Sequence, residues 1–351
     1  MYKPVILLGN GIRDNPERIA AICKMQLPVL TTWMGADLIP EEAPFCGRPG
    51  ILGQRAANII QQQATHFYCI GARMDGDQVA YAIDRFAPNA QVVVYDIDTE
   101  EIKKLPDHWI GCRVDLNSVN KFETDPAPEW LKEARALYDE HRPELDGGDE
   151  LDPFSFTRLL SEAGQPDDVF AIGSSGAAPC VFYQAFKVKR GQRIHNVSTI
   201  GAMGADIPMA LGSAVASGKR TICVTGDGGF QLNAQELETI KRLSLPITFF
   251  VMNNNGYGSI RNMQNVRFEG RHVGCDPDSG LTLPPLEALA GGYGIMHKSI
   301  RELSDFKGFA SFPIIYEVFI APEWQQFPRV MASVVDGELR TDDMEDMSPK
   351  C

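Results

Sequence analysis

Residues 221–260 read TICVTGDGGFQLNAQELETIKRLSLPITFFVMNNNGYGSI, which is two apolar strand-like runs separated by a helical stretch. The first run ends in the turn Gly226-Asp227-Gly228-Gly229, and the second ends in Asn253-Asn254-Asn255-Gly256. A strand, a helix and a second strand in succession predict a parallel β-α-β crossover. We therefore expect both loops at one edge of one sheet, where α/β proteins bind their ligands.

Both loops carry groups that suit a phosphate and a metal ion. Glycines let the backbone approach a ligand closely, and exposed N–H groups at the start of a helix can bind phosphate oxygens. Asp227 supplies a carboxylate, Asn254 an amide oxygen and the second loop a backbone carbonyl, which together form the oxygen set that Mg²⁺ prefers. Taken singly, each loop is more simply a tight turn. Their combination on successive strands favours a site for Mg²⁺ and a diphosphate.

The rest of the chain repeats the alternation of strands and helices. Strands are expected at 4–9, 27–33, 66–71, 91–98, 169–173 and 313–320, and helices at 16–25, 78–86, 129–141, 209–216 and 233–243. Residues 91–96 are apolar almost throughout, which is typical of a strand that is covered on both faces. The pattern predicts the α/β class, with mainly parallel sheets flanked by helices.

The acidic, glycine-bearing stretch 143–153, PELDGGDELDP, predicts a linker between two domains. We expect a first α/β domain over 1–145 and a second over 146–330, because a length of 351 residues suits two domains. The charged C-terminal tail, 331–351, is expected on the surface or over a site.

Composition excludes some classes of partner. The chain has 46 acidic and 33 basic side chains, and a net charge of −13 argues against binding to nucleic acid or to an anionic membrane. Its eight cysteines are scattered without a CxxC pair, which is typical of free thiols in a reducing compartment. No apolar run approaches the length of a membrane span, and residues 1–10 lack the pattern of a signal peptide. We expect a soluble, cytoplasmic protein.

The stretch 221–260 resembles the diphosphate-binding motif of thiamine-diphosphate enzymes, in which GDG is followed by a helix, a strand and paired asparagines. The separation of 27 residues between Asp227 and Asn254 suits that motif. Upstream, IGAMGADIP at 200–208 is similar to the GLGTMGxGLP segment of acetolactate-synthase-like members. In the first half, PVLTTWMG at 28–35 and GARMD at 71–75 resemble the central domain of the same family. The resemblance covers nearly the whole chain.

This resemblance implies a Rossmann-like central domain followed by a thiamine-diphosphate-binding fold, with thiamine diphosphate and Mg²⁺ as cofactors. It implies that the side chains of Asp227 and Asn254 and the backbone carbonyl of Gly256 bind the metal. The residues implied to contact the cofactor are Gly201, Ala202, Met203, Gly226, Asp227, Gly228, Gly229, Asn254, Gly256, Tyr257 and Gly258. Met203 would hold the cofactor in its bent conformation, although by itself it reads more simply as a core residue at a helix start.

Members of the family normally begin with a further domain, which binds the aminopyrimidine ring and carries the catalytic glutamate. This sequence starts at the first strand of the central domain and contains no counterpart of that domain. The resemblance therefore implies one subunit of a split enzyme. A separate pyrimidine-domain subunit would supply the glutamate, in a hetero-oligomer with two copies of each chain.

The implied activity is decarboxylation of a 2-keto acid and transfer of the resulting carbanion to an acceptor, as in an acetolactate-synthase-like carboligase. A simple 2-keto acid decarboxylase subunit and a non-catalytic scaffold or regulatory subunit are the alternatives. A nicotinamide dehydrogenase is excluded, because no G-x-G-x-x-G segment opens a helix in either domain.

Several positions depart from acetolactate synthase and leave the substrates open. Met263 stands where that enzyme has the tryptophan that selects the second keto acid. Asp206 replaces a common glycine and either begins a helix or faces the cofactor. Arg261 either neutralises a substrate carboxylate or lies on the surface. The segment LGQRA at 52–56 lacks the histidine and second glycine of the loop that holds FAD, so FAD is the less favoured option.

Overall fold

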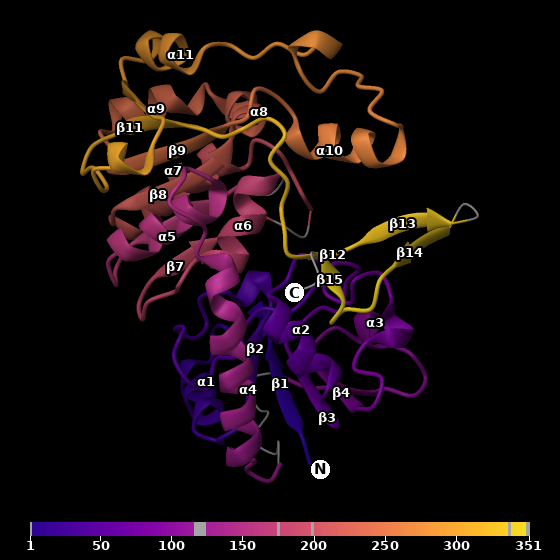
Figure 1. Ribbon diagram of the computed structural model, residues 1–351. Helices are drawn as coiled ribbons and strands as arrows, with labels where there is room; N and C mark the ends of the chain where they lie inside the picture. The colour runs from indigo at the N-terminus through magenta and orange to yellow at the C-terminus, as the bar shows by residue number, and fades with distance from the viewer. Residues whose placement is uncertain (1, 116–123, 174–175, 198–199, 336–337, 349–351) are drawn as a thin grey trace. The chain divides into compact units, whose positions relative to one another are not determined.

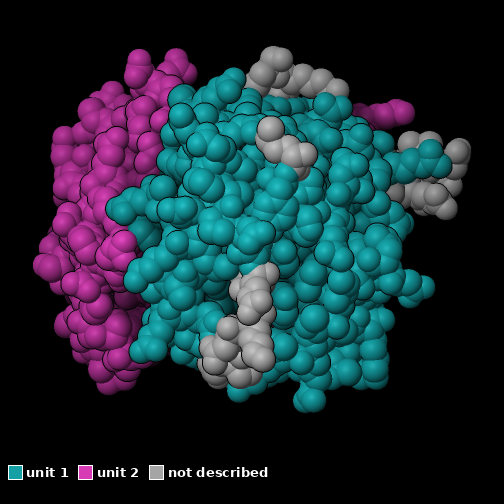
Figure 2. Space-filling model, turned by 90° about the horizontal axis from the view of Figure 1, so that it is seen from below, with its two compact units in different colours: residues 1–145, 327–351 teal, residues 146–326 magenta. Residues whose placement is uncertain are grey.

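The computed structural model describes residues 2–115, 124–173, 176–197, 200–335 and 338–348. The chain divides into two compact units, which have different colours in Figure 2. The first unit comprises Met1–Leu145 together with Phe327–Cys351, and the second comprises Asp146–Gln326. Each unit is built on its own parallel sheet, so the predicted α/β class is confirmed.

The sheet of the first unit has five parallel strands in the order β2-β1-β3-β4-β5. Their bounds are β1 Pro4–Leu8, β2 Val29–Thr31, β3 His66–Ile70, β4 Gln91–Asp96 and β5 Ile110–Arg113. Around this sheet lie the helices α1 Pro16–Cys23, α2 Arg55–Gln62, α3 Thr99–Ile102 and α4 Pro128–His141 and the 3-10 turns Asn10–Ile12, Trp33–Gly35, Ile83–Arg85 and Arg142–Leu145 (Figure 1).

Alternating side chains of β1 build the two faces of this unit's core. Val5 and Leu7 pack in one cluster with Ile60 of α2, whereas Ile6 and Leu8 pack in another with residues of α1. This alternation is the two-residue period of a strand, and all five residues of β1 are buried. An apolar run without polar interruptions is therefore the sequence signature of a strand with helices on both faces.

The helix that we predicted over 78–86 is absent from the structure. Ala80 and Tyr81 have φ values of 49° and 55°, which no right-handed helix accommodates, and only the 3-10 turn Ile83–Arg85 forms. Val79 and Ala80 are nevertheless buried in the core. Their apolar character thus reflects a turn that packs against the sheet.

The C-terminal residues are also placed differently from the prediction. The tail expected over 331–351 is part of the first unit, whose C-terminal portion starts at Phe327. Strand β12 (Arg329–Val330) pairs with β15 (Met347–Ser348), and β13 (Ala332–Val335) pairs with β14 (Glu338–Thr341). Met344 and Met347 are buried in the core of this unit. Because most of their neighbours in the sequence are charged or polar, no sequence pattern indicated that these two methionines are buried.

The second unit has a six-stranded parallel sheet in the order β10-β11-β9-β8-β6-β7. Its strands are β6 Val169–Ile172, β7 Arg193–His195, β8 Thr221–Gly226, β9 Ile247–Asn253, β10 Met296–Ile300 and β11 Ile314–Phe319. Its helices are α5 Pro153–Ala163, α6 Ala177–Ala185, α7 Asp206–Ser217, α8 Asp227–Phe230, α9 Glu236–Arg242, α10 Gly258–Arg267 and α11 Leu286–Gly292, with 3-10 turns at Gln231–Asn233, Pro277–Ser279 and Leu303–Asp305.

Two different packings cover the faces of this second sheet. One face packs Phe249 and its neighbours against the aliphatic side chains of α7, α9 and α11. The other face is aromatic, with Phe250 at 5.3 Å from Phe156 of α5 and at 5.2 Å from Tyr316, measured between ring centroids. With both faces buried, the open carboxyl edge of the sheet is where a ligand can reach the backbone.

The cysteines and the helices bear on two expectations from the sequence, free thiols and the lack of a membrane span. None of the seven cysteines in its described part forms a disulfide, and Cys46, Cys69, Cys223 and Cys275 are buried. Across the described residues, no helix has both the length and the apolar character that crossing a membrane requires.

Candidate functional site

Strands β8 and β9 are neighbours in the sheet, with Gly226 opposite Met252. Their carboxyl ends therefore meet, and the two loops predicted to converge do so. The backbone N–H of Gly256, in the asparagine loop, donates to Oδ2 of Asp227 over 2.9 Å. Asp227 is the first residue of the one-turn helix α8, which follows β8 directly.

Asp227 is buried, and among the described residues no cationic side chain forms a hydrogen bond with it. It is 6% exposed, and its Oδ1 accepts the backbone N–H of Gly228 over 2.8 Å. Burial raises the pKa of Asp227 to about 6, although the N–H groups of Gly256, Gly228 and Asn254 and the charge of Arg261 act in the opposite direction. A buried carboxylate that backbone dipoles stabilise only in part favours binding of a cation.

Three glycines around this carboxylate have no room for a side chain. A Cβ on Gly228 would lie 2.4 Å from Cε1 of Tyr257, and a Cβ on Gly258 would lie 2.2 Å from Nδ2 of Asn254. Gly256 has a φ of +136°, and its Cβ would lie 2.3 Å from the carbonyl oxygen of Cys275. These contacts explain why glycine occupies these positions of the motif.

Asp227, Asn254 and Gly256 offer the oxygen donors that a hard cation such as Mg²⁺ requires. The side-chain amide of Asn254 lies against Gly258. The carbonyl oxygen of Gly256 accepts the N–H of Gly258 over 3.1 Å, and its second lone pair can still bind an ion. The donor set and the tight glycine backbone thus fit a metal ion together with a diphosphate.

Next to these groups lies a cavity of about 210 Å³. The residues that line it are Pro153, Gly176, Gly201, Met203, Gly226, Asp227, Gly228, Gly229, Met252, Asn254, Tyr257, Gly258, Ser259, Ile260, Ile320 and Trp324. The sequence-predicted cofactor residues all line it except Ala202 and Gly256. Gly256 is not a lining residue, and its N–H bonds to Asp227, which is one.

The other lining residues were not predicted, and only some had a usable signal. Met252 and Ile320 lie at or just after the carboxyl ends of neighbouring strands β9 and β11, so the strand order would have placed them here. Pro153 and Trp324 come from segments far away in the sequence and carry no motif. Both lie beside Phe154, whose ring centroid is 5.9 Å from that of Trp324.

The cavity has a polar and an apolar part. Asp227, Asn254 and the glycine backbone form the polar part. Met203 is 39% exposed, and its Cε would lie 3.4 Å from a Cβ on Gly228. Together with Ile260 it belongs to an apolar part that suits an uncharged ring.

Asp206 does not line the cavity but bonds to Thr225, the residue before the glycine turn. It begins α7, is 3% exposed, and accepts the N–H of Ile207 over 3.0 Å and the hydroxyl of Thr225. A Cβ on Gly229 would lie 3.2 Å from its Oδ2. Burial raises the pKa of this carboxyl. Of the two interpretations of Asp206, the helix-start residue is the one that the structure shows.

Two further residues do not contact the cavity. Met263, in α10, is absent from the lining, whereas Ser259 and Ile260 of the same helix contribute to it. Arg261 is buried and bonds to backbone carbonyls and to Asp276, so it is available neither to a substrate carboxylate nor at the surface. Both alternatives considered for Arg261 from the sequence were wrong.

Comparisons with known proteins agree with this geometry. The family described as thiamine pyrophosphate enzyme, C-terminal TPP binding domain, matches residues 174–309, and the corresponding central domain matches 2–120. The large subunit of acetolactate synthase isozyme 2 from Escherichia coli is 30% identical over 304 residues, covering 84% of this chain and 54% of that protein.

A second relative, the acetolactate synthase large subunit of Corynebacterium glutamicum, is 28% identical, with 96% of this chain and 58% of that protein covered. The chain therefore spans little more than half of the length of these curated relatives. Both the glycine-aspartate turn and the paired asparagines fall within the C-terminal match. The chain belongs to the thiamine pyrophosphate enzyme family, of which it carries the central domain and the C-terminal TPP-binding domain.

Proposed function

We propose that this chain is the diphosphate-binding part of a thiamine-diphosphate- and Mg²⁺-dependent carboligase. It would decarboxylate a 2-keto acid and transfer the resulting carbanion to an acceptor, as the relatives named acetolactate synthase suggest. The observation that carries the proposal is the buried Asp227, held against the asparagine loop at the carboxyl edge of the sheet. Bound thiamine diphosphate would supply the electron sink for decarboxylation.

The chain's own residues would bind and orient the cofactor. Asp227, the side chain of Asn254 and the carbonyl of Gly256 would hold Mg²⁺, which neutralises the diphosphate. The apolar part of the cavity, with Met203 and Ile260, would support the ring portion and exclude water from the reacting carbon.

The described lining residues supply one carboxylate, that of Asp227, and this one is engaged at the polar part. The glutamate that activates the cofactor in this family must therefore come from elsewhere. We propose that a separate pyrimidine-domain subunit provides it, in a hetero-oligomer with two copies of each chain. The exposed side chains of Met203, at 39%, and Ile260, at 39%, support a covered rather than a solvated mouth of the cavity.

Turnover measurements with and without the second subunit test this proposal. The purified chain would be assayed with pyruvate, thiamine diphosphate and Mg²⁺, alone and mixed with a candidate pyrimidine-domain chain from the same organism. We expect release of CO₂ and formation of a carbon–carbon bond only in the mixture. Substantial turnover by the chain alone would contradict the split, whereas an aldehyde as the sole product would replace the carboligase with a simple decarboxylase.

A further inference from the structure

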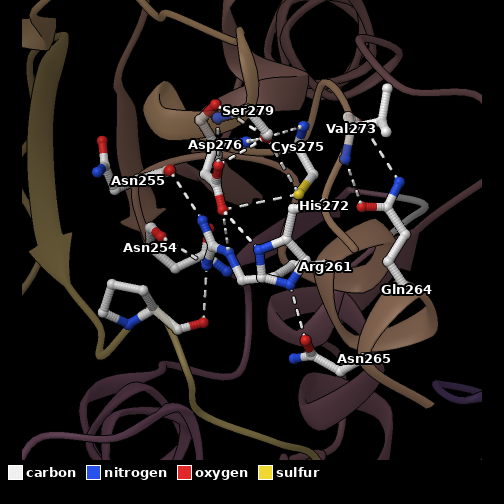
Figure 3. Close-up of polar contacts among 12 residues, drawn as sticks. Asn254, Asn255, Arg261, Gln264, Asn265, His272, Val273, Cys275, Asp276 and Ser279 are labelled. Carbon is white, nitrogen blue, oxygen red and sulfur yellow. Dashed lines mark hydrogen bonds and ion pairs between the residues drawn. The ribbon is translucent and has the colours of Figure 1, made fainter. Parts of the chain in front are cut away.

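The asparagine loop, residues 253–256, forms hydrogen bonds with an arginine that does not line the cavity (Figure 3). Arg261 lies in the first turn of α10 and is 7% exposed. Its Nη1 donates to the carbonyl oxygen of Asn254 over 3.3 Å and to that of Pro322 over 2.8 Å. Its Nη2 donates to the carbonyl oxygen of Asn255 over 3.0 Å. One guanidinium thus bonds to two successive carbonyls of the loop.

The backbone conformation of the loop explains why such a donor is needed. Asn255 has a φ of 58° and Gly256 one of 136°, so the chain continues neither as strand β9 nor as a helix at these residues. Carbonyls in such a stretch receive no hydrogen bonds from regular secondary structure, so a side-chain donor can bond to them. A planar guanidinium presents several N–H groups at fixed angles, which suits two adjacent carbonyls.

Asp276 fixes the orientation of the guanidinium. Its Oδ2 accepts Nε of Arg261 over 3.2 Å, while its Oδ1 accepts the N–H of Ser279 over 2.9 Å and the hydroxyl of Ser279 over 2.6 Å. The hydrogen bonds from Ser279 and Arg261 lower the pKa of Asp276 to about 2. The carboxylate is thus charged at neutral pH and constrained on both oxygens.

The residue before Asp276 contacts the loop on its other side. The carbonyl oxygen of Cys275 accepts the N–H of Tyr257 over 2.8 Å. Segment 271–280 in turn lies along α10, where Gln264 exchanges two hydrogen bonds with the backbone of Val273. The loop is therefore enclosed between the Arg261 side chain and the backbone of Cys275.

From these contacts we propose that Arg261, oriented by Asp276, is a positioning residue that holds residues 254–256 in their metal-binding conformation. The proposal rests on the proposed function, since it concerns the same Mg²⁺ site. It assigns to Arg261 no contact with the cofactor. Turning the carbonyls of Asn254 and Asn255 toward the guanidinium leaves the side chain of Asn254 and the carbonyl of Gly256 for the ion.

The same segment invites a different interpretation as a second metal site. One potential ligand atom each from His272, Cys275 and Asp276 lie within 4.8 Å of one another. However, Oδ2 of Asp276 already accepts Nε of Arg261, and Nε2 of His272 is 2.7 Å from Oδ1 of Asn265. A divalent ion at this cluster would lie beside the guanidinium and be repelled by it. The hydrogen bonds of Arg261 to Asp276 and to the carbonyls of Asn254 and Asn255, called the Arg261 clamp below, are therefore the better account of this segment.

Mg²⁺ titrations at a fixed concentration of thiamine diphosphate test the clamp. For Arg261→Met we expect the Mg²⁺ concentration at half-saturation to rise at least about tenfold, the size of effect that loss of charged hydrogen bonds produces. Saturating Mg²⁺ should restore cofactor affinity to near the wild-type value, which general destabilisation would not allow. Arg261→Lys should lie between, and Asp276→Asn should act in the same direction. Arg267→Met, an exposed site on the same helix, is the matched control and should change little.

Hydrogen exchange in the metal-free chain separates this proposal from the proposed function. Arg261→Met should speed exchange of the Gly256 and Tyr257 amides, and Arg267→Met should not. Unchanged exchange in Arg261→Met would overturn the clamp even if the wild-type chain binds Mg²⁺ and the cofactor. Conversely, faster exchange without any cofactor binding would support the clamp and refute the proposed function. Stoichiometric Zn²⁺ binding that His272→Gln abolishes would replace the clamp with a metal site.

Discussion

Asp227 is the only charged side chain among the described residues that line the cavity. It is buried, and the backbone groups of two loops hold both of its oxygens. Such a carboxylate is costly to ionise without a counter-ion, which is the state that a metal ion relieves. The ionised state of Asp227 that would bind a metal ion therefore also lowers the stability of the metal-free fold.

The first prediction concerns the pH dependence of stability in the metal-free chain. The pKa of Asp227, about 6, is raised from its ordinary value of 3.8, so this group stabilises the fold fully below pH 4. That contribution is lost as the pH rises through about 6, and by linkage it amounts to about 3 kcal/mol at most. Urea unfolding from pH 4 to pH 7 in the presence of a chelator measures it.

Burial raises the pKa of the Asp206 carboxyl as well. The quantity to compare is therefore the difference between wild type and Asp227→Asn, which cannot ionise. The wild type should lose stability relative to this variant as the pH rises. A constant difference, or one of opposite sign, would contradict the assignment of a raised pKa to Asp227.

The second prediction uses two glycines of the same site. Gly256→Ala should cost about 2 kcal/mol or more, because its Cβ would lie 2.3 Å from the carbonyl oxygen of Cys275 at a φ of +136°. Gly226→Ala places its Cβ in open space and should change the free energy of unfolding by about 0.5 kcal/mol or less. Chemical denaturation of the metal-free chain measures both. Equal effects at the two positions would refute the steric account.

The convergence of Asp227 and Asn254 could be predicted from the sequence, because each directly follows a strand and the two strands are neighbours in the sheet. The apolar part was predicted less completely. Trp324 lines the cavity from an irregular segment after β11, and no local sequence pattern predicts such a contact. The role of Arg261 depends on two positive φ angles and a distant aspartate, which only tertiary structure brings together.

Local side-chain hydrogen bonds determine where some helices begin, and α5 is an example. Helix α5 begins with a capping box, in which Oδ1 of Asp152 accepts the N–H groups of Phe154 and Ser155, and the hydroxyl of Ser155 accepts the N–H of Asp152. Pro153 occupies the first helical position, where its missing N–H is not needed. This helix start also lines the cavity through Pro153.

The third prediction therefore concerns this cap. Asp152→Ala should lower the free energy of unfolding by about 1 kcal/mol, since it removes two hydrogen bonds from otherwise unpaired N–H groups. Asp149→Ala, at an exposed position shortly before the helix, should have no measurable effect. Thermal unfolding followed by circular dichroism distinguishes the two variants. A matching loss in both would indicate a general effect of charge and not of the cap.

The strands were predicted more reliably than the helices for a physical reason. A buried parallel strand such as β9 is a continuous apolar run, and that pattern survives any tertiary context. The segment 78–86 has apolar residues at a spacing typical of a helix, yet Ala80 and Tyr81 have positive φ values. Burial alone is therefore compatible with a turn as well as with a helix.

At the scale of the whole molecule, the C-terminal residues return to the first unit and complete its core. Asn58 of α2 makes the central contacts, since its Nδ2 donates to the carbonyl oxygens of Gly50, over 3.0 Å, and of Met344, over 2.9 Å. Its Oδ1 accepts the N–H of Gly50 over 2.9 Å. One buried amide thus joins α2, a loop and the C-terminal segment. Sequence patterns could not reveal this return, because it depends on contacts between residues 286 positions apart.

The fourth prediction is that Asn58→Ala loosens the C-terminal segment. Losing these hydrogen bonds inside the core should cost about 3 kcal/mol, because the backbone partners remain buried without them. Limited proteolysis should cut the variant within 327–351 faster than the wild type. Asn89→Ala, at an exposed position of the same unit, is the control. Equal cleavage rates in all three proteins would show that the segment is held by other contacts.

The central claim is that this chain binds the diphosphate of thiamine diphosphate through Mg²⁺ at Asp227. Calorimetric titration of thiamine diphosphate into the chain tests it, with Mg²⁺ or with a chelator. We expect binding only with Mg²⁺ and a loss of at least about tenfold, or 1.4 kcal/mol, for Asp227→Asn. Asp167→Asn, which changes an exposed aspartate before β6, should bind like the wild type. Binding that persists without Mg²⁺, or that Asp227→Asn leaves unchanged, would contradict the account.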